Sequence, residues 1–275
     1  PAELTTEEGQ RLLERLAAFG SPLPHVVLTG GDPLKRDDLF DLVAFARGLG
    51  FGVSLAPSAT PLLTEDAIRA MLGRTRPRDA VHGEERDDSG WGPRRWVIDP
   101  IDGTANFVRG VPVWATLIGL MVGDEVVAGV VSAPALSRRW WAAKGGGAFT
   151  GRSLLQGVPC RTSGVASIED ASLSYSSIHG WVDSGRGQQF VDLMRACWRT
   201  RAYGDFWSYM LVAEGAVDVA AEPELALHDM AALVPIVTEA GGRFTNLDGS
   251  PGPHGPGAIA TNGLLHEEMV DRLAL

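Results

Sequence analysis

Apolar residues in the first quarter of the chain alternate between helical and strand spacing. Leucines and a phenylalanine recur at three- and four-residue intervals over 5–19, which predicts an amphipathic helix. Helical spacing returns over 37–49 and 64–72, whereas short apolar runs over 26–28 and 51–56 predict buried strands. Strand, helix, strand and helix joined by short links are typical of a parallel α/β arrangement.

The remaining chain continues to mix the two patterns. Alternating apolar and polar residues over 113–122 and 125–133 predict a β-hairpin around Gly123. We expect further strands over 80–82, 96–98 and 138–143, and helices over 186–199, 205–215, 229–240 and 264–273. Strands layered with helices in this way predict a mixed α/β fold.

Composition and charge exclude several classes of protein. The 275 residues are 45% hydrophobic and 21% charged, which is ordinary for a globular protein. A formal net charge of −10 disfavours nucleic-acid partners, because no basic patch would gather on phosphates. Two cysteines are too few for a disulfide framework or a cysteine metal site. Since the chain has neither a run of about eighteen apolar residues nor a signal-peptide pattern, we expect a cytoplasmic protein without membrane partners.

Two aspartates three positions apart form the densest cluster of candidate metal ligands. Residues 99–104 read Asp-Pro-Ile-Asp-Gly-Thr and follow a short apolar strand, and Glu84 follows another. Hard cations such as Mg²⁺ prefer carboxylates, water and substrate phosphate to a closed protein cage. Pro100 fixes a backbone dihedral, Gly103 permits a strained turn, and Thr104 offers a hydroxyl that can orient water. The alternative is a turn whose aspartates only cap the next element.

These residues also carry a family resemblance. The stretch 96–107, Trp-Val-Ile-Asp-Pro-Ile-Asp-Gly-Thr-Ala-Asn-Phe, resembles the signature of the inositol monophosphatase family of Mg²⁺-dependent phosphatases. That family has a second signature, an aspartate that opens a helix rich in small residues, and the segment 227–233 resembles it with Asp229 in register. The family more often has Trp where His228 stands. The resemblance covers about residues 72–275 and implies the layered αβαβ sandwich of the sugar and inositol phosphatases.

The resemblance implies catalytic roles for three of the residues. Productive metal pairs lie roughly 3.5 to 4 Å apart and share a carboxylate, and we assign this bridge to Asp99. Glu84 is expected to bind the first metal and, together with Thr104, to orient the attacking water.

The resemblance also implies ligands for the second metal and for the phosphate. Asp102 and Asp229 are expected to hold the second metal, which stabilises the leaving oxygen. The backbone carbonyl of Ile101 is a further expected ligand, and the amides of Gly103 and Thr104 are expected to face the phosphate.

Two more acidic residues indicate the substrate. Asp205 follows a glycine where inositol phosphatases usually have small residues, and Glu222 lies seven residues before Asp229. Gly-Asp with aromatic residues behind it resembles the histidinol-phosphatase branch, and acids attract an ammonium group where a polyol needs only neutral partners. We therefore expect hydrolysis of histidinol phosphate in histidine biosynthesis, with inositol 1-phosphate or another small monoester as the alternative. Trp207 and Tyr209 are expected to pack in the core.

Residues 1–71 resemble a different family. The segments 28–34 and 57–64 are similar to the middle of a radical SAM enzyme barrel, in which a Gly-Gly-acid turn contacts S-adenosylmethionine. That family needs three upstream cysteines for an iron–sulfur cluster, and this chain has none there. Radical chemistry and a SAM-binding module are therefore disfavoured.

The opening segment bears on the phosphatase site. In the resembled family an aspartate of the outer metal site precedes the glutamate that matches Glu84, and the corresponding position here is Pro61, which offers no ligand. We expect residues 1–71 to replace the family's N-terminal helices through a natural fusion, a recombination or an assembly artefact. An inactive chimera is a further alternative, and whether the family's usual homodimer persists is left open.

Overall fold

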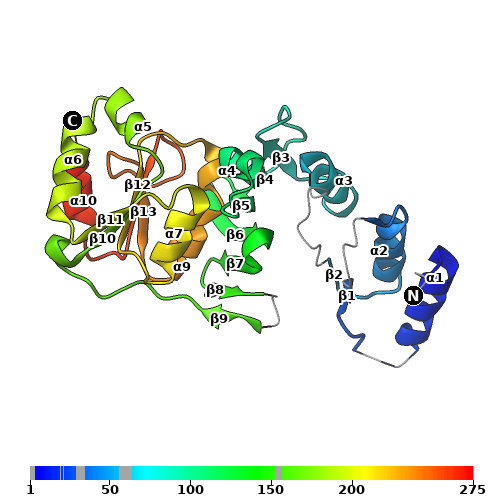
Figure 1. Cartoon of the computed structure of the whole chain (residues 1–275). Coiled ribbons are helices and arrows are strands. Elements are labelled where there is room, and N and C mark those ends of the chain that lie inside the picture. The colour runs from blue at the N-terminus through cyan, green and yellow to red at the C-terminus, as the bar shows by residue number, and fades with distance from the viewer. Residues whose placement is uncertain are drawn as a thin grey trace. The chain divides into compact units, whose positions relative to one another are not determined.

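The computed structural model describes residues 4–18, 20, 22–28, 35–55, 64–152 and 156–274. The chain divides into two compact units, Pro1–Arg74 and Thr75–Leu275 (Figure 1). Each unit has hydrophobic clusters of its own. None of the described helices is both long and apolar enough to cross a membrane.

The first unit follows the predicted strand–helix–strand–helix order. Its elements are α1 (Thr6–Ala17), β1 (Val26–Leu28), α2 (Leu39–Gly48), β2 (Val53–Leu55) and α3 (Glu65–Thr75). The two strands pair in parallel, and Leu13, Leu42 and Phe51 are buried between the elements. The Gly-Gly-acid turn at 30–32 and the position of Pro61 lie outside the described residues.

The second unit contains two sheets. Their strand orders are β3-β4-β5-β6-β7-β8-β9 and β11-β10-β12-β14-β13. The larger sheet consists of β3 (Ala80–Gly83), β4 (Arg94–Asp102), β5 (Ala115–Val122), β6 (Glu125–Ala133), β7 (Arg138–Ala143), β8 (Gly147–Gly151) and β9 (Val158–Pro159). The smaller sheet consists of β10 (Ser172–Ser174), β11 (Arg199–Arg201), β12 (Val219–Glu222), β13 (Arg243–Thr245) and β14 (Ala258–Thr261).

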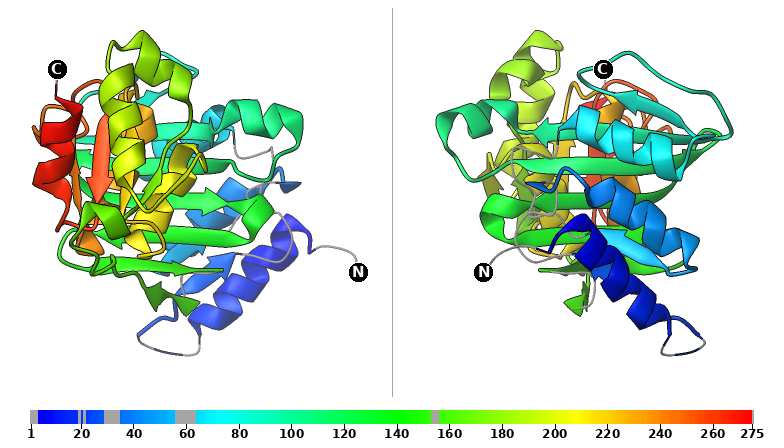
Figure 2. Two further views of the ribbon diagram at one scale, coloured as in Figure 1. Left: turned by 60° about the vertical axis from the view of Figure 1, so that its left-hand side comes forward. Right: turned by 90° about the vertical axis from the view of Figure 1, so that its right-hand side faces the viewer.

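Helices fill the space between the sheets and cover the smaller one. The helices of this unit are α4 (Thr104–Arg109), α5 (Ile178–Asp183), α6 (Gly187–Ala196), α7 (Asp205–Ala213), α8 (Leu227–Met230), α9 (Leu233–Glu239) and α10 (His266–Leu273). In Figure 1, α7 and α9 lie between the two sheets, and their Met210 and Ile236 share one core with Val131 and Ala260. On the far face of the smaller sheet, α6 and α10 lie side by side (Figure 2). The predicted sheet–helix–sheet–helix layering is confirmed.

One predicted helix is divided. We expected a continuous helix over 229–240, but α8 ends at Met230 and α9 begins at Leu233. Pro235 accounts for the break, because its ring would clash with the carbonyl of Ala231 in a continuous helix. In the observed structure Pro235 stands in the first turn of α9, where backbone N–H groups have no helical acceptor.

Glycines allow α9 to approach the larger sheet closely. A Cβ added at Gly129 in β6 would lie 2.2 Å from the carbonyl oxygen of Ala232, just before α9. A Cβ added at Gly119 in β5 would lie 2.9 Å from the Cβ atom of Ala231. The chain between α8 and α9 therefore lies directly on these two strands.

We predict that Gly129→Ala lowers the free energy of unfolding by about 1–3 kcal/mol, the usual range for overpacking. The added methyl group would meet backbone, which cannot rotate away as a side chain can. Chemical denaturation measures the change. Gly164→Ala is the matched control, because a Cβ there meets nothing within 4 Å, and an unchanged Gly129→Ala protein would contradict the packing described here.

Candidate active site

A β-bulge brings Asp99 and Asp102 to one face of the larger sheet. Residues three positions apart in a regular strand point to opposite faces. Here Asp99 pairs with Leu117 and Asp102 pairs with Ala115, so three steps along β4 match two steps along β5. The extra residue in β4 changes the direction of the following side chain. Both carboxyl groups therefore reach the same site.

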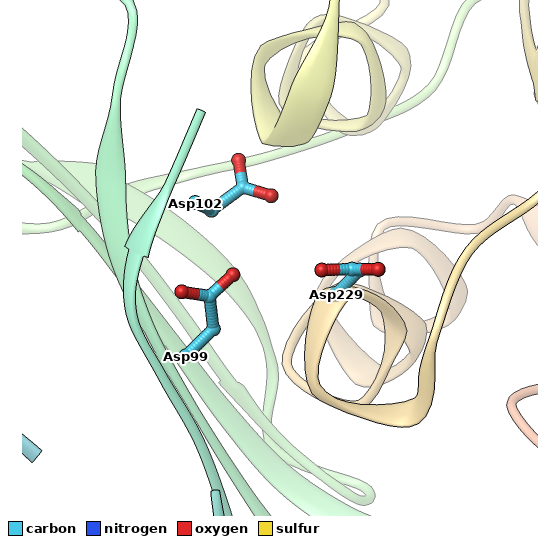
Figure 3. A group of neighbouring side chains, drawn as sticks. All are labelled: Asp99, Asp102 and Asp229. Carbon is cyan, nitrogen blue, oxygen red and sulfur yellow. The ribbon is translucent and has the colours of Figure 1, made fainter. Parts of the chain in front are cut away.

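Asp229 completes a group of three carboxylates. It comes from α8, and ligand oxygens of Asp99, Asp102 and Asp229 lie within 4.8 Å of one another. Figure 3 shows the carboxyl groups of β4 and α8 gathered in one place. Asp99 and Asp102 are only 2% and 8% exposed. Within the described ranges, no second group of this kind occurs.

Each of the three aspartates accepts a backbone hydrogen bond through one oxygen. The bonds run from Ile101 N to Asp99 Oδ1 (2.9 Å), from Phe206 N to Asp102 Oδ2 (2.9 Å) and from Ala226 N to Asp229 Oδ2 (2.7 Å). These bonds fix the orientation of the carboxyl groups. The other oxygen of Asp229, Oδ1, lies 3.5 Å from Nε2 of His228.

The electrostatics of the cluster favour a bound cation. Burial, followed by the charges of Asp102, Glu84 and Asp229, raises the pKa of Asp99 to about 10. Burial and the charge of Asp205 also raise the pKa of Asp102. The surrounding cavity of about 300 Å³ has no basic side chain among its described lining residues. Because all the donors are oxygens, the site fits a hard divalent cation.

The residues expected to handle water and phosphate line the same cavity. Glu84 directly follows β3, whose Gly83 pairs with Ile98 of β4, so Glu84 comes beside Asp99 at the end of the neighbouring strand. It is exposed and lies outside the group of three. The hydroxyl of Thr104 donates to the carbonyl oxygen of Ile101 at 2.9 Å. Its oxygen therefore keeps lone pairs that can accept a hydrogen bond from water.

Gly103 is required by the turn between β4 and α4. Its φ is 80°, in the left-handed region, and an added Cβ would lie 2.9 Å from the carbonyl oxygen of Val113. The same Cβ would lie 3.2 Å from Oδ2 of Asp205. A side chain at this position would therefore crowd the cavity as well as strain the backbone.

The two acids expected to bind the substrate also reach the cavity. Asp205 begins α7 with a φ of 50°, and its Oδ2 accepts a hydrogen bond from Nδ2 of Asn106 at 2.8 Å. Glu222, at the end of β12, accepts from the hydroxyl of Ser176 at 2.6 Å through Oε2. Burial raises the pKa of Glu222 to about 8. All nine predicted site residues thus line one cavity.

Sequence reasoning missed the part that Tyr209 plays in this cavity. We expected it to pack in the core, and its ring is 1% exposed and lies 5.6 Å from that of Phe244, centroid to centroid. Tyr209 is nevertheless a lining residue, and its hydroxyl has no hydrogen-bond partner in the described structure. The available signal was its position four residues after Asp205, which puts both on one face of a helix.

Comparisons with known proteins show which family this chain resembles. A model of the inositol monophosphatase family matches residues 58–274, so the match begins within the opening segment 1–71. The chain is 55% identical over 260 residues to a histidinol-phosphatase of Streptomyces coelicolor, and the alignment covers 91% of this chain and 95% of that protein. It is 52% identical to a histidinol-phosphatase of Mycobacterium tuberculosis, over 86% of this chain and 94% of the relative.

A solved structure is also similar to this chain. An IMPase of Thermotoga maritima matches with a TM-score of 0.67 at 33% identity. The match covers 76% of this chain and 79% of that chain.

We predict that Asp99→Asn removes activity and stabilises the metal-free protein. The amide keeps an oxygen for the N–H of Ile101 but loses the charge that holds a cation, so phosphatase activity should fall roughly 10³-fold or more. Folded Asp99 has to take up a proton that the unfolded chain lacks at neutral pH, whereas asparagine is neutral in both states, so the melting temperature in EDTA should rise. Phosphate release and thermal unfolding measure the two effects. A fully active variant would contradict the proposed ligand role.

We also predict that the metal-free protein loses stability as pH rises. Folding raises the pKa of Asp99 from 3.8 to about 10, so its stabilising contribution is complete below pH 4 and is lost progressively above it. The loss should not exceed about 1.4 kcal/mol per pH unit for this group. Calorimetry in EDTA between pH 5 and 9 tests the slope, which should be smaller in Asp99→Asn; equal slopes would refute the assignment.

Proposed function

From the premise that this chain belongs to the inositol monophosphatase family and is a phosphoric monoester hydrolase, we propose that it uses Mg²⁺ to hydrolyse histidinol phosphate. The observation that supports this substrate most directly is the presence of Asp205 and Glu222 in the cavity that contains the three aspartates. Histidinol phosphate carries a phosphate for the metal end and two nitrogen groups for these acids.

The donor set suits Mg²⁺. Asp99, Asp102 and Asp229 would hold the cations, with Glu84 and the carbonyl oxygen of Ile101 as further ligands. Bound Mg²⁺ supplies positive charge that lowers the pKa of water and screens the phosphate.

Side chains of the chain itself would position the attacking water. The hydroxyl proton of Thr104 is used by the carbonyl of Ile101, so the Thr104 oxygen can only accept from that water. Glu84 is exposed at the cavity and can accept the second hydrogen bond and the proton. The amides of Gly103 and Thr104 would donate to phosphate oxygens.

Asp205 and Glu222 would bind the nitrogen-bearing end of the substrate. An ammonium or imidazolium group gains charge-assisted hydrogen bonds from two carboxylates, whereas inositol offers only hydroxyl groups. The hydrogen bond from Asn106 holds the Asp205 carboxylate in place. Inositol 1-phosphate is the alternative substrate, because its phosphate would meet the same metal end.

We further propose that residues 1–71 stand in the sequence where the family has its N-terminal helices. Support comes from the separate unit Pro1–Arg74. The family match begins at residue 58 and so includes the last part of this segment. The outer metal would then lack a ligand at Pro61 and bind weakly. We also propose the cytoplasm as the compartment and the homodimer usual in the family as the assembly.

We predict Mg²⁺-dependent turnover of histidinol phosphate that exceeds turnover of inositol 1-phosphate by about 10²-fold in kcat/KM, because charge-assisted bonds to two acids distinguish the substrates. EDTA should abolish both activities. Asp205→Asn should reduce the preference while retaining hydrolysis of p-nitrophenyl phosphate, which lacks a nitrogen-bearing group that binds these acids. A preference for inositol 1-phosphate would overturn the proposed substrate.

A further inference from the structure

Two buried polar atoms in the cavity have no partner. They are the hydroxyl of Tyr209 and Oε1 of Glu222, and neither makes a hydrogen bond to any described residue. Tyr209 and Glu222 are 1% and 5% exposed, and both line the cavity of the candidate active site. Buried polar groups in folded proteins are nearly always hydrogen-bonded, so two unpaired atoms in one cavity indicate a missing ligand.

The pair has complementary chemistry. Oε2 of Glu222 is already bonded to Ser176, and Oε1 accepts a hydrogen bond in the ionised form of the group, which predominates above a pH of about 8. The Tyr209 phenol keeps its proton, because burial and the charges of the surrounding acids, with Glu222 first among them, raise its pKa. Its hydroxyl can therefore donate. A ligand that satisfies both atoms needs an N–H donor and an acceptor.

We propose that Tyr209 is a specificity-determining residue that binds the imidazole ring of the substrate together with Glu222. This inference rests on the proposed function. One ring nitrogen donates its N–H to Oε1 of Glu222, and the other accepts from the hydroxyl of Tyr209. A neutral imidazole has one nitrogen of each kind.

The surroundings favour the ring over the ammonium group at this position. Phe206, Leu225 and Leu233 also line the cavity and offer apolar contacts to a flat ring. An ammonium group would lose its water here at a greater cost than a neutral ring. Asp205 is less buried and is left as the partner of the ammonium group.

The test compares Tyr209→Phe with the wild-type enzyme on three substrates. Histidinol phosphate carries both nitrogen groups, phosphoethanolamine carries only the ammonium group, and p-nitrophenyl phosphate carries neither. We expect Tyr209→Phe to raise KM for histidinol phosphate about tenfold at nearly constant kcat, as for a lost hydrogen bond in binding. The other two substrates should be unaffected. Tyr203→Phe is the control, because Tyr203 is 40% exposed and is not a lining residue.

Two measurements separate binding from a structural role. Histidinol should bind the metal-free wild-type protein in calorimetry and bind Tyr209→Phe about tenfold more weakly. The melting temperature of Tyr209→Phe should not fall, because removal of an unpaired buried hydroxyl breaks no hydrogen bond. If the variant nevertheless folds poorly, Glu222→Gln replaces it and should show the same selective rise in KM.

Failure of the inference about Tyr209 and failure of the proposed substrate would give different results. An unchanged KM for histidinol phosphate, or an equal rise for phosphoethanolamine, would overturn the assignment of Tyr209 to the imidazole. Hydrolysis of p-nitrophenyl phosphate without any turnover of histidinol phosphate by the wild type would instead overturn the proposed substrate, and the inference with it. Non-additive effects of Tyr209→Phe and Glu222→Gln in a double-mutant cycle would support binding to one shared group.

Discussion

Repulsion between buried carboxylates governs this structure. The fold brings Asp99, Asp102 and Asp229 within 4.8 Å of one another, and two of them are almost inaccessible to water. Such a group is unfavourable unless the carboxyl groups take up protons or a cation neutralises them. Protonated carboxyl groups no longer offer charged oxygens to a metal ion. A bound cation, in contrast, adds positive charge that can attract a phosphate group. If a cation binds to these three side chains as proposed, metal binding and folding stability are linked through them.

The second constraint is that the cluster is fixed to the backbone of distant elements. Asp102 accepts the N–H of Phe206 at the start of α7, 104 residues further along the chain. This bond joins the end of β4 to the helix that carries Asp205 and Tyr209. A displacement of α7 would therefore disturb Asp102 together with Asp205 and Tyr209. Helix α7 thus contributes to both ends of the cavity.

Local sequence patterns predicted much of the fold and of the candidate site. The hairpin of β5 and β6 follows from alternation, and the acidic cluster follows from the segment 99–104. Pro235 could have been interpreted as a helix break within 229–240, but the small-residue pattern favoured continuity. Contacts between distant segments were not predictable, because no local pattern pairs Asn106 with Asp205 across 99 positions. The β-bulge is also a property of two paired strands, and only the pairing reveals it.

The division of the cavity suggests how one phosphatase fold acquires different substrates. The end with the three aspartates, which is the proposed metal end, is formed by the bulge of β4 and by α8, and a change there is expected to affect every substrate. The other end is formed by α7 and the end of β12, where Asp205, Tyr209 and Glu222 contribute side chains that the metal cluster does not need. The ring of Tyr209 also packs in the core, so a phenylalanine could replace it without disturbing the fold. Substrate choice can thus change through single polar groups on α7 while the chemistry at β4 stays the same.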